Sequence, residues 1–460
     1  MIKSLKQLVN QIDSMTYYGS DIPIEHVAIH SKDVQINSLF VAIVGQRDGH
    51  EFVDQAIAHG AAAILVNRYN PDWPVSQIVC DDTTQGLQQL AQKRREQFTM
   101  PIAALTGSCG KTTVKTMVVD LLGEFGHVFC SPGNYNNLLG VPITLLCAPK
   151  DCDYLVIEAG TNSPGEIAQL ADLIQPDVAL ITNIGAAHLE KLKTLQGVMQ
   201  EKSALLKALG PQGVAIINDD DPYIRAFATD LSCHQYHVSQ TQKQADFFQS
   251  CVNNNINSND WQITLPDQRQ ITYTLPLQGQ HQAMNSLLAF AMAYAMVGER
   301  ILTTAAQTFA QMQPYQGRFV PIKLNAHITL IDDSYNASVL SVQAALAFLQ
   351  HQNTHRIFVM SDMGELGQQA IHYHHHVGQL MKSSCDQAFL YGQSNLIQAM
   401  AEPAAPQQVG CFDDQNQLID RLMQSIHAHA NQPMTIVIKG ARSRHMDQVV
   451  AALKTTFSTR

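Results

Sequence analysis

The chain has 460 residues, and because domains usually contain about 150 residues, its length predicts three domains with sizeable cores. The 29 basic and 39 acidic residues give a net charge of −10, which argues against nucleic acid or an anionic membrane surface as the main partner. Hydrophobic residues make up 45% of the chain, a composition typical of a folded protein. The longest apolar stretch, 287–297, is shorter than the roughly 20 residues that cross a bilayer, so it predicts a buried helix and no membrane span.

The N-terminal segment lacks the continuous apolar core of a signal peptide. The nine cysteines are scattered without a C-x-x-C pair, which predicts neither a disulfide framework nor a zinc knuckle. We therefore expect a protein of the reducing cytoplasm, in which the cysteines, including Cys109, have no chemical role.

Short apolar segments alternate with helix-length segments along most of the chain, which is typical of α/β domains with mainly parallel sheets. In the first part we expect a helix at 51–59 and strands at 27–30, 39–44, 62–66 and 78–80. Several N-cap residues at 81–84 predict a helix that continues to about residue 97 and a domain boundary near residue 82.

In the central part, the pattern predicts helices at 111–125, 283–297 and 303–312 and strands at 102–105, 154–157, 178–182 and 214–217. The polar segment 251–260 and the two short strands after it predict a β excursion from the sheet. Pro314 and Gly317 indicate a hinge. Beyond it we expect helices at 338–350 and 445–453 and strands at 328–331, 356–360, 388–391 and 435–438. The predicted domains are 1–82, 83–314 and 315–460.

The clearest motif is the strand-loop-helix segment ALTGSCGKTT at 104–113. Small residues let backbone N–H groups surround a phosphate, and the following helix adds the partial positive charge of its N-terminus. Lys111 would then reach the terminal phosphates, and the Thr112 hydroxyl would bind Mg²⁺. Leu105 stands where the strict P-loop pattern has its first glycine, so the alternative is a glycine-rich turn with an incidental lysine.

Two further candidates follow apolar strands, at the sheet edge where ligands bind in open α/β sheets. Glu158 ends the segment YLVIE and supplies the carboxylate that a P-loop metal site needs. His188 follows the next strand, although an ordinary surface or core histidine is the alternative. Lys202 has no feature that distinguishes it from a lysine on a helix surface.

The third part offers two weaker candidates. Asp332 and Asp333 end a strand, where they would either contact a sugar and base or cap the following helix. In the run 372–376 (HYHHH), His372 and His376 are four residues apart and could share a metal ion. We expect a solvated helix face there instead.

Together these motifs resemble those of the Mur ligases, the ATP-dependent amide-forming enzymes of peptidoglycan precursor synthesis. The resemblance covers about 24–450 and includes the segments 38–42, 48–52, 133–137, 331–337, 362–367 and 439–443. Four of the segments, 133–137, 331–337, 362–367 and 439–443, are typical of the members that add D-alanyl-D-alanine, and a D-N-P-R segment of the third-residue-adding members is absent from the sequence. The resemblance implies three α/β domains: a small N-terminal one, a central one with a P-loop-type parallel sheet, and a Rossmann-like C-terminal one.

The resemblance also implies ligands and their contacts. It implies ATP, two Mg²⁺ ions and the substrates UDP-N-acetylmuramoyl-tripeptide and D-alanyl-D-alanine. We expect a monomer, and from the net charge no nucleic acid partner. The implied catalytic residues are Lys111, Lys202, His188 and Arg318. The implied metal ligands are Thr112, Glu158, His188 and Lys202, with a carbamate on Lys202. The implied nucleotide contacts are Thr106, Gly107, Ser108, Cys109, Gly110, Lys111, Thr112, Thr113, Asn218, His281, Asn285, Arg318, Asp333 and Asn336. The implied contacts with the other substrates are Ser31, Asp48, Gly49, His50, Asn134, Tyr135, Asn136 and Asn137.

The sequence departs from the family pattern mainly outside the nucleotide site. His30-Ser31-Lys32 replaces Asp-[Ser/Thr]-Arg near the uridine site, and Ala441 replaces a serine. The implied reaction transfers the γ-phosphoryl of ATP to the terminal carboxylate of the tripeptide, whose third residue is diaminopimelate or lysine. The alternatives are a third-residue-adding or folylpolyglutamate-type ligase, and a P-loop switch protein that binds nucleotide without making an amide.

Overall fold

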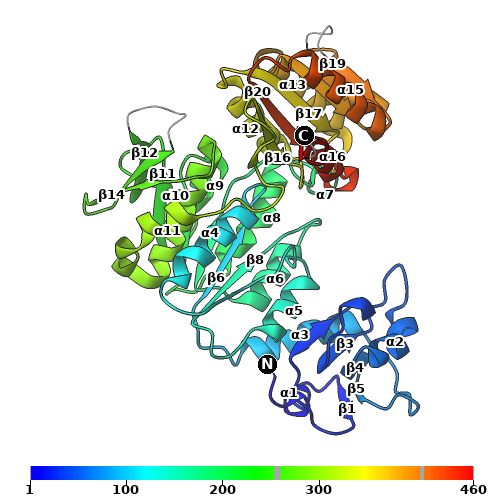
Figure 1. Ribbon diagram of the computed structural model, residues 1–460. Coiled ribbons are helices and arrows are strands. Elements are labelled where there is room, and N and C mark those ends of the chain that lie inside the picture. The colour runs from blue at the N-terminus through cyan, green and yellow to red at the C-terminus, as the bar shows by residue number, and fades with distance from the viewer. Residues whose placement is uncertain (1, 253–258, 405–408, 459–460) are drawn as a thin grey trace.

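A computed structural model describes residues 2–252, 259–404 and 409–458 (Figure 1). It contains three β-sheets that follow one another along the chain, and helices flank each of them. The first sheet lies at the lower right of Figure 1, the second in the centre and the third at the top.

The first sheet has five strands, all parallel except for one edge strand. Its spatial order is β1 (Thr16–Tyr18), β5 (Ser76–Val79), β4 (Ala61–Val66), β3 (Ser38–Val41) and β2 (His26–Ala28). Its helices are α1 (Leu5–Val9), η1 (Ser31–Asp33), η2 (Gly49–Phe52) and α2 (Val53–Ala58), and α3 (Thr83–Arg95) follows it. The Asp82 side chain accepts hydrogen bonds from two backbone N–H groups of α3, so this helix begins where the capping residues predicted.

The second sheet has nine strands. Its spatial order is β14 (Gln270–Thr274), β13 (Asp260–Thr264), β12 (Phe247–Cys251), β11 (His234–Ser239), β10 (Val214–Asn218), β9 (Val178–Ile181), β6 (Ile102–Thr106), β8 (Tyr154–Glu158) and β7 (Val128–Cys130). The strands from β12 to β7 are parallel, whereas β12, β13 and β14 pair antiparallel and form the predicted β excursion. The sequence predicts a polar segment at 251–260, before these strands. Residues 253–258 of that segment lie outside the described part of the chain.

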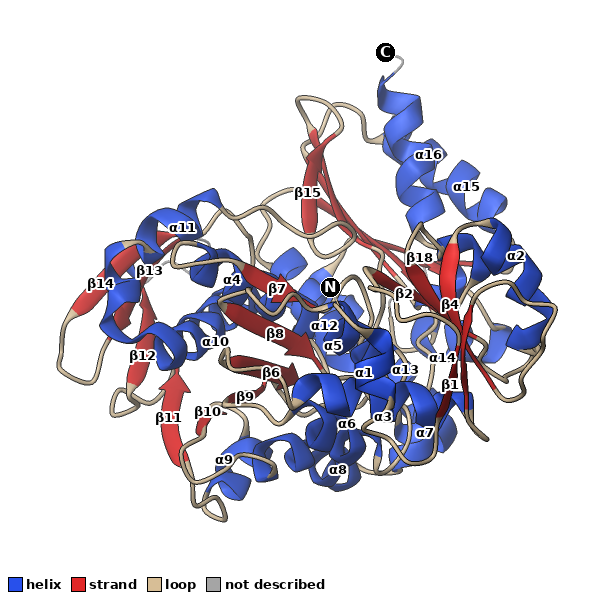
Figure 2. Cartoon of the chain, turned by 90° about the horizontal axis from the view of Figure 1, so that it is seen from below, coloured by secondary structure: helices blue, strands red, loops and turns tan. Residues whose placement is uncertain are grey.

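Helices cover both faces of the second sheet (Figure 2). Alternate residues of β6 belong to two different cores, which explains why this strand is apolar throughout. One face packs against α4 (Lys111–Gly123), α10 (Gln280–Val297) and α11 (Ala305–Gln311). The other carries α5 (Gly140–Cys147), α6 (Glu166–Ile174), α7 (Leu189–Leu192), α8 (Leu195–Lys207) and α9 (Pro222–Ala228).

The long helix α10 is the predicted buried helix. In the described part of the chain, α10 with the following 3-10 helix η4 (Gly298–Thr303) is the one stretch long and apolar enough to cross a membrane. More than half of its most apolar window is buried inside the protein, as expected for a core helix.

The third sheet has six strands and is parallel except for its edge strand β15. Its spatial order is β15 (Val320–Lys323), β16 (Ile328–Asp333), β20 (Met434–Lys439), β17 (His355–Ser361), β18 (Gln387–Tyr391) and β19 (Val409–Phe412). The surrounding helices are α12 (Val339–Gln350), η5 (Gly367–Gln369), α13 (Ala370–Ser384), α14 (Ser394–Ala401), α15 (Gln415–Ala428), η7 (Arg442–Arg444) and α16 (Asp447–Ser458).

The histidine run on α13 corrects one expectation. The face is not solvated throughout, because His374 is fully buried; its Nε2 accepts a hydrogen bond from the Met363 backbone N–H at 2.9 Å. Burial lowers the pKa of His374, so its ring is neutral. His376 contacts Gln343, and no group of three or more metal-ligating side chains occurs among the described residues.

Candidate active site

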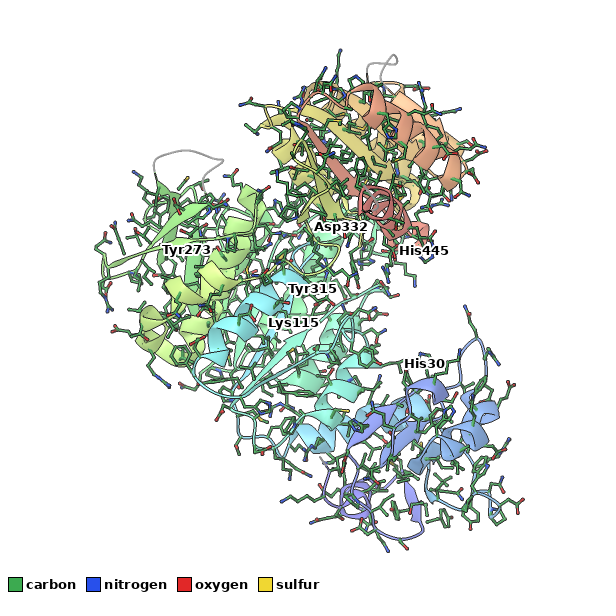
Figure 3. The ribbon with its side chains drawn as sticks, viewed as in Figure 1. His30, Lys115, Tyr273, Tyr315, Asp332 and His445 are labelled. Carbon is green, nitrogen blue, oxygen red and sulfur yellow. The ribbon has the colours of Figure 1, made fainter. Side chains whose placement is uncertain are left out.

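A cavity of about 900 Å³ lies between the second and third sheets. Its walls come from the loop after β6, the ends of β8, β9 and β10, the start of α10, residues 317–319 of the predicted hinge, and the ends of β16 and β20. The carboxyl edges of two parallel sheets thus face the same cavity, which is where α/β sheets bind ligands. Figure 3 shows the hinge residue Tyr315 between Lys115 of the second domain and Asp332 of the third.

The loop after β6 has the backbone that the motif predicts. Gly107 and Gly110 have φ values of 152° and 84°, and Gly110 precedes the first turn of α4. A Cβ atom at Gly107 would lie 1.8 Å from the Thr182 hydroxyl oxygen, so no side chain fits there. Leu105 is still part of β6 and is buried in the core, which explains why no glycine is needed at that position.

The end of β9 holds this loop in place, through a residue that the sequence did not single out. The Asn183 side chain accepts a hydrogen bond from the Cys109 N–H at 2.9 Å and donates one to the Cys109 carbonyl at 3.0 Å. Ser108 hydrogen-bonds to Gly185. Residues 108–113 line the cavity, whereas Thr106 and Gly107 lie behind it.

The structure brings together Lys111, Thr112 and Glu158, three of the predicted residues. Lys111 Nζ donates a hydrogen bond to the Gly107 carbonyl at 2.8 Å, and the Thr112 hydroxyl donates one to Glu158 Oε2 at 2.9 Å. Burial favours the neutral form of Glu158, but the charges of Lys111 and Lys115 outweigh it, and the pKa of the carboxyl is lowered. An ionised carboxylate therefore lies beside a hydroxyl at the start of α4.

Lys115, one helical turn after Lys111, is a fourth member of this cluster that sequence reasoning missed. Its ammonium lies 3.6 Å from Glu158 Oε2 and donates hydrogen bonds to the carbonyls of Ser131 and Gly133 at 2.8 and 3.2 Å. Lys115 is 4% exposed. It thus ties the loop after β7 to the carboxylate of Glu158.

Lys202 corrects the prediction of an ordinary helix-surface lysine, because it is only 1% exposed. The neighbouring Glu201 orients α8, since its carboxylate accepts hydrogen bonds from the Gly165 and Ile167 N–H groups at the start of α6. Burial, and next the charge of Lys111, lower the pKa of Lys202 well below its usual value. Its side chain makes no hydrogen bond with any residue that the structure describes.

His188 lines the cavity and contacts the third domain. Its Nδ1 lies 2.6 Å from Glu365 Oε2, and the pKa of Glu365 is lowered by this hydrogen bond. The backbone supports the same contact, because the Glu190 N–H donates to the Glu365 carbonyl at 3.0 Å. Glu365 lies in a segment that carried the family resemblance, but only the arrangement of the domains reveals its partner.

Arg318 extends from the hinge into the second domain. Its Nη2 donates a hydrogen bond to the Thr112 hydroxyl at 3.1 Å, and its guanidinium carbon lies 4.2 Å from the centre of the Tyr335 ring. In the described structure its Nε is buried without a hydrogen-bond partner. Arg318 therefore joins the P-loop-type helix to the third domain.

The start of α10 and the end of β10 supply three predicted nucleotide contacts to the cavity wall. Asn218 donates a hydrogen bond to the Thr182 carbonyl at 2.8 Å. Asn285 packs against the loop, since a Cβ atom at Gly110 would lie 2.7 Å from its side-chain oxygen. Burial, and next the charge of Lys439, lower the pKa of His281 to about 4, so its ring is neutral.

Asp333 and Asn336 line the cavity from the third domain. Both contact the buried ammonium of Lys439, which is paired with the Asp333 carboxylate and donates to the Asn336 carbonyl at 3.1 Å. Burial raises the pKa of Asp333 despite this partner. Asp332 accepts hydrogen bonds from Ser334, so it supports the turn after β16.

Residues 134–137 belong to the segment between β7 and α5, on the second-domain side of the cavity. Asn134, Asn136 and Asn137 line the cavity, whereas Tyr135 packs against the core. Asn136 donates a hydrogen bond to Glu158 Oε1 at 2.8 Å, and Asn137 caps the first N–H groups of α5. Two of the four predicted contacts thus already have partners within the protein.

The four predicted contacts of the first domain do not reach this cavity. Asp48 accepts hydrogen bonds from the backbone N–H and the ring Nδ1 of His50, at 3.0 and 2.6 Å, and Gly49 has no room for a Cβ atom beside Ile43. On η1, the Ser31 hydroxyl donates a hydrogen bond to the side-chain oxygen of Gln55 at 2.8 Å. In Figure 3 the adjacent His30 lies on the side of this domain that faces the rest of the molecule.

The oxygen atoms beside the P-loop-type helix fit a magnesium ion. Thr112 and the ionised Glu158 offer the oxygen donors that Mg²⁺ prefers. Mg²⁺ is usually held by one or two carboxylates together with phosphates and water, and Glu158 would supply one such carboxylate.

The site combines a phosphate-binding loop, an ionised carboxylate and an arginine that reaches the loop from the third domain. These features define a P-loop-type nucleotide enzyme. Family sequence models agree: "Mur ligase middle domain" matches residues 105–293 and "Mur ligase, glutamate ligase domain" matches residues 317–442. The chain belongs to the Mur ligase family.

Individual relatives extend this result. The UDP-N-acetylmuramoyl-tripeptide–D-alanyl-D-alanine ligase of Escherichia coli is 36% identical and covers 95% of each chain. The crystal structure of MurF from Acinetobacter baumannii matches with a TM-score of 0.89 at 32% identity over 99% of each chain. MurF from Thermotoga maritima, in complex with ADP, has the same fold, with a TM-score of 0.83 at 24% identity over 95% of this chain and 98% of that one. The predicted three-domain α/β architecture is confirmed.

Proposed function

We propose that this protein is an ATP-dependent ligase that joins D-alanyl-D-alanine to UDP-N-acetylmuramoyl-tripeptide, completing a peptidoglycan precursor. The central observation is the contact of Arg318 with Thr112, which brings a cation of the third domain to the phosphate-binding loop. The family and the near full-length relatives of that activity support the choice of substrates. The net charge and the family favour a cytoplasmic enzyme that binds small molecules.

The chemistry begins with a carboxylate, which is a poor electrophile. Transfer of the γ-phosphoryl group of ATP to a carboxylate oxygen of the tripeptide releases ADP and gives an acyl phosphate. The amine of D-alanyl-D-alanine then attacks the carbonyl carbon, loses a proton and expels phosphate, which keeps one of the carboxylate oxygens. Lys111 and Arg318, which contact the loop and the start of α4, would stabilise negative charge on the phosphoryl oxygens during the transfer.

We assign the metal-binding role to Thr112, Glu158, His188 and Lys202. Bound Mg²⁺ would neutralise phosphate charge and orient the phosphoryl oxygens. Because His188 Nδ1 faces Glu365, its Nε2 is the nitrogen left for a ligand. A neutral amine reacts with CO₂ to form a carbamate, and the lowered pKa of Lys202 favours that neutral form. A carbamate would give Lys202 an anionic oxygen donor.

The three domains divide the work in this proposal. Residues 1–82, with Ser31, Asp48, Gly49 and His50, would hold the uridine nucleotide, and residues 134–137 would contact the same substrate nearer the cavity. Residues 83–314 would bind ATP. Residues 315–460 would close over it with Asp333 and Asn336 and bind D-alanyl-D-alanine. Closure excludes water, which would otherwise hydrolyse the acyl phosphate.

An omission assay tests the proposal. Phosphate release is followed with ATP, Mg²⁺, UDP-N-acetylmuramoyl-tripeptide and D-alanyl-D-alanine, leaving out each in turn. We expect phosphate release that matches the amount of pentapeptide product and requires both UDP-N-acetylmuramoyl-tripeptide and D-alanyl-D-alanine. An amide product formed from UDP-N-acetylmuramoyl-dipeptide and free diaminopimelate or lysine would favour a third-residue-adding ligase. Nucleotide binding without any amide product would favour a switch protein.

A further inference from the structure

A glycine of the second domain and a leucine of the third fit together beside the phosphate-binding loop. Gly185 is buried in the segment between β9 and α7, and Leu340 is the second residue of α12. A Cβ atom at Gly185 would lie 2.3 Å from Leu340 Cδ1 and 2.5 Å from its Cγ, so the leucine side chain lies directly against the glycine backbone. The leucine therefore fills a hollow that exists only because residue 185 has no side chain.

Gly185 is also joined to the phosphate-binding loop. The Ser108 hydroxyl donates a hydrogen bond to the Gly185 carbonyl at 3.1 Å and accepts one from the Gly185 N–H at 2.9 Å. Gly185 thus contacts the loop through its backbone polar groups and the third domain through its missing side chain. Because Ser108 and Leu340 both line the cavity, a shift of Leu340 would change the cavity wall beside the loop.

Leu340 is close in the chain to the residues that the third domain would place over ATP. Asp333 precedes it by seven residues and Asn336 by four, in the segment that connects β16 to α12. The Tyr335 N–H of this segment donates a hydrogen bond to the Gly317 carbonyl of the predicted hinge at 3.0 Å. A fixed position for Leu340 therefore restrains both this segment and the hinge.

We propose that Leu340 is a positioning residue, and that its contact with Gly185 sets the distance between the third domain and the phosphate-binding loop. The contact acts through shape alone, because neither residue has a polar side chain. Closely packed groups have no spare volume, so even one added methyl group forces a neighbour to move. This inference rests on the nucleotide-binding part of the proposed function and does not depend on the identity of the amide substrates.

A size swap tests the proposal. Gly185 has no positive φ, so alanine suits its backbone and changes only the contact. In Gly185→Ala, Leu340 must turn into the cavity or α12 must move away, and kcat/KM for ATP should fall at least about tenfold. Leu340→Ala should lower it about two- to fivefold through looser packing. The double variant should be no worse than Leu340→Ala alone, since alanine lacks the Cγ and Cδ atoms that the added methyl group would meet.

Two further measurements separate positioning from a general loss of structure. The KM for UDP-N-acetylmuramoyl-tripeptide should stay within about twofold of the wild-type value in all three variants. In calorimetry with Mg²⁺ and ADP alone, Gly185→Ala should bind ADP at least about fivefold more weakly, and the double variant should recover the affinity of Leu340→Ala. Gly123→Ala is the matched control, because a Cβ atom at Gly123 meets nothing within 4 Å, and it should behave like the wild type.

The outcomes distinguish this inference from the proposed function. Equal activity of Gly185→Ala and the wild type would overturn the inference. A double variant as impaired as Gly185→Ala would overturn it too, because the alanine would then disturb the loop without any help from Leu340. Either result would leave the ligase activity standing. A wild-type protein that binds ADP but forms no amide would overturn the proposed function, and the ADP affinities of the variants would still decide the inference.

Discussion

Three lysines around the phosphate-binding loop have different surroundings and therefore different chemistry. Lys111 hydrogen-bonds to the loop itself, and Lys115 is held by two carbonyls and Glu158. Lys202 is buried and close enough to Lys111 for the charge of that residue to lower its pKa. Of the three, only Lys202 has a side chain that makes no hydrogen bond or ion pair with any residue that the structure describes. In the proposed function, the same type of side chain is thus a phosphate contact, a structural cation and a candidate for carbamylation.

The first prediction concerns Lys111. Lys111→Ala should reduce kcat of ligation by at least about 10³-fold, because it removes a positioned charge from the transferring phosphoryl group. Circular dichroism and the melting temperature should remain close to those of the wild type. Lys382→Ala, which removes an exposed lysine from α13, is the control and should be fully active. Substantial ligation by Lys111→Ala would contradict the nucleotide site.

The second prediction concerns Lys202. Lys202→Ala should have little activity, and short carboxylic acids should restore part of it by taking the place of the carbamate. After incubation with ¹³C-bicarbonate, the wild-type protein should show a carbamate signal by ¹³C NMR that the variant lacks. A fully active variant, or a wild-type protein without that signal, would show that the amine acts unmodified or not at all.

At the scale of elements, the strand ends determine how much of the site could be predicted. Parallel strands place the residues that follow them at one edge, so the sequence alone places Thr112, Glu158 and His188 together. Lys115 could also have been found, since it lies one helical turn after Lys111. The burial of Lys202 could not, because it depends on how Glu201 anchors α8 to α6. Short elements such as β1 and β7, of three residues each, have too few residues for a recognisable pattern.

The third prediction concerns α10, which begins beside the loop. His281 has a pKa of about 4 in the folded protein against 6.5 normally, so the unfolded chain binds a proton that the folded chain does not. The free energy of unfolding should therefore fall as the pH drops from 6.5 toward 4, by about 2 kcal/mol at pH 5 from this group. Urea unfolding at pH 7 and at pH 5 measures this change in the free energy of unfolding. His281→Gln should lack this part of the loss, whereas His372→Gln, at an exposed histidine, should retain it.

At the scale of the whole molecule, the third domain contacts the second around the cavity. The hydrogen bond from Arg318 to Thr112, the pair of His188 and Glu365, and the backbone bond from Glu190 to Glu365 join the two domains around the cavity. All three contacts lie beside the proposed site of phosphoryl transfer. In the proposed function, closure of the third domain would therefore also complete the site. No sequence pattern reveals such contacts, because the partners are far apart along the chain.

The fourth prediction tests the contact between α7, which carries Glu190, and the segment 365–367 of the third domain. A Cβ atom at Gly367 would lie 2.9 Å from the Glu190 Cα, and Gly367 has a φ of 56°, so Gly367→Ala should push η5 away from α7. We expect kcat to fall at least about tenfold through misplaced groups, with a larger radius of gyration by small-angle X-ray scattering. Gly364→Ala is the control, because a Cβ atom there meets nothing within 4 Å. Equal activity of the two variants would mean that this contact does not position the site.

The most direct test of the central claim follows the oxygen atoms. UDP-N-acetylmuramoyl-tripeptide with ¹⁸O in its terminal carboxylate is incubated with ATP, Mg²⁺, D-alanyl-D-alanine and the enzyme. An acyl phosphate intermediate predicts one ¹⁸O atom in the inorganic phosphate for each amide formed, together with ADP, as measured by mass spectrometry. Amide formation with unlabelled phosphate, or with the label in AMP, would contradict phosphoryl transfer to the carboxylate.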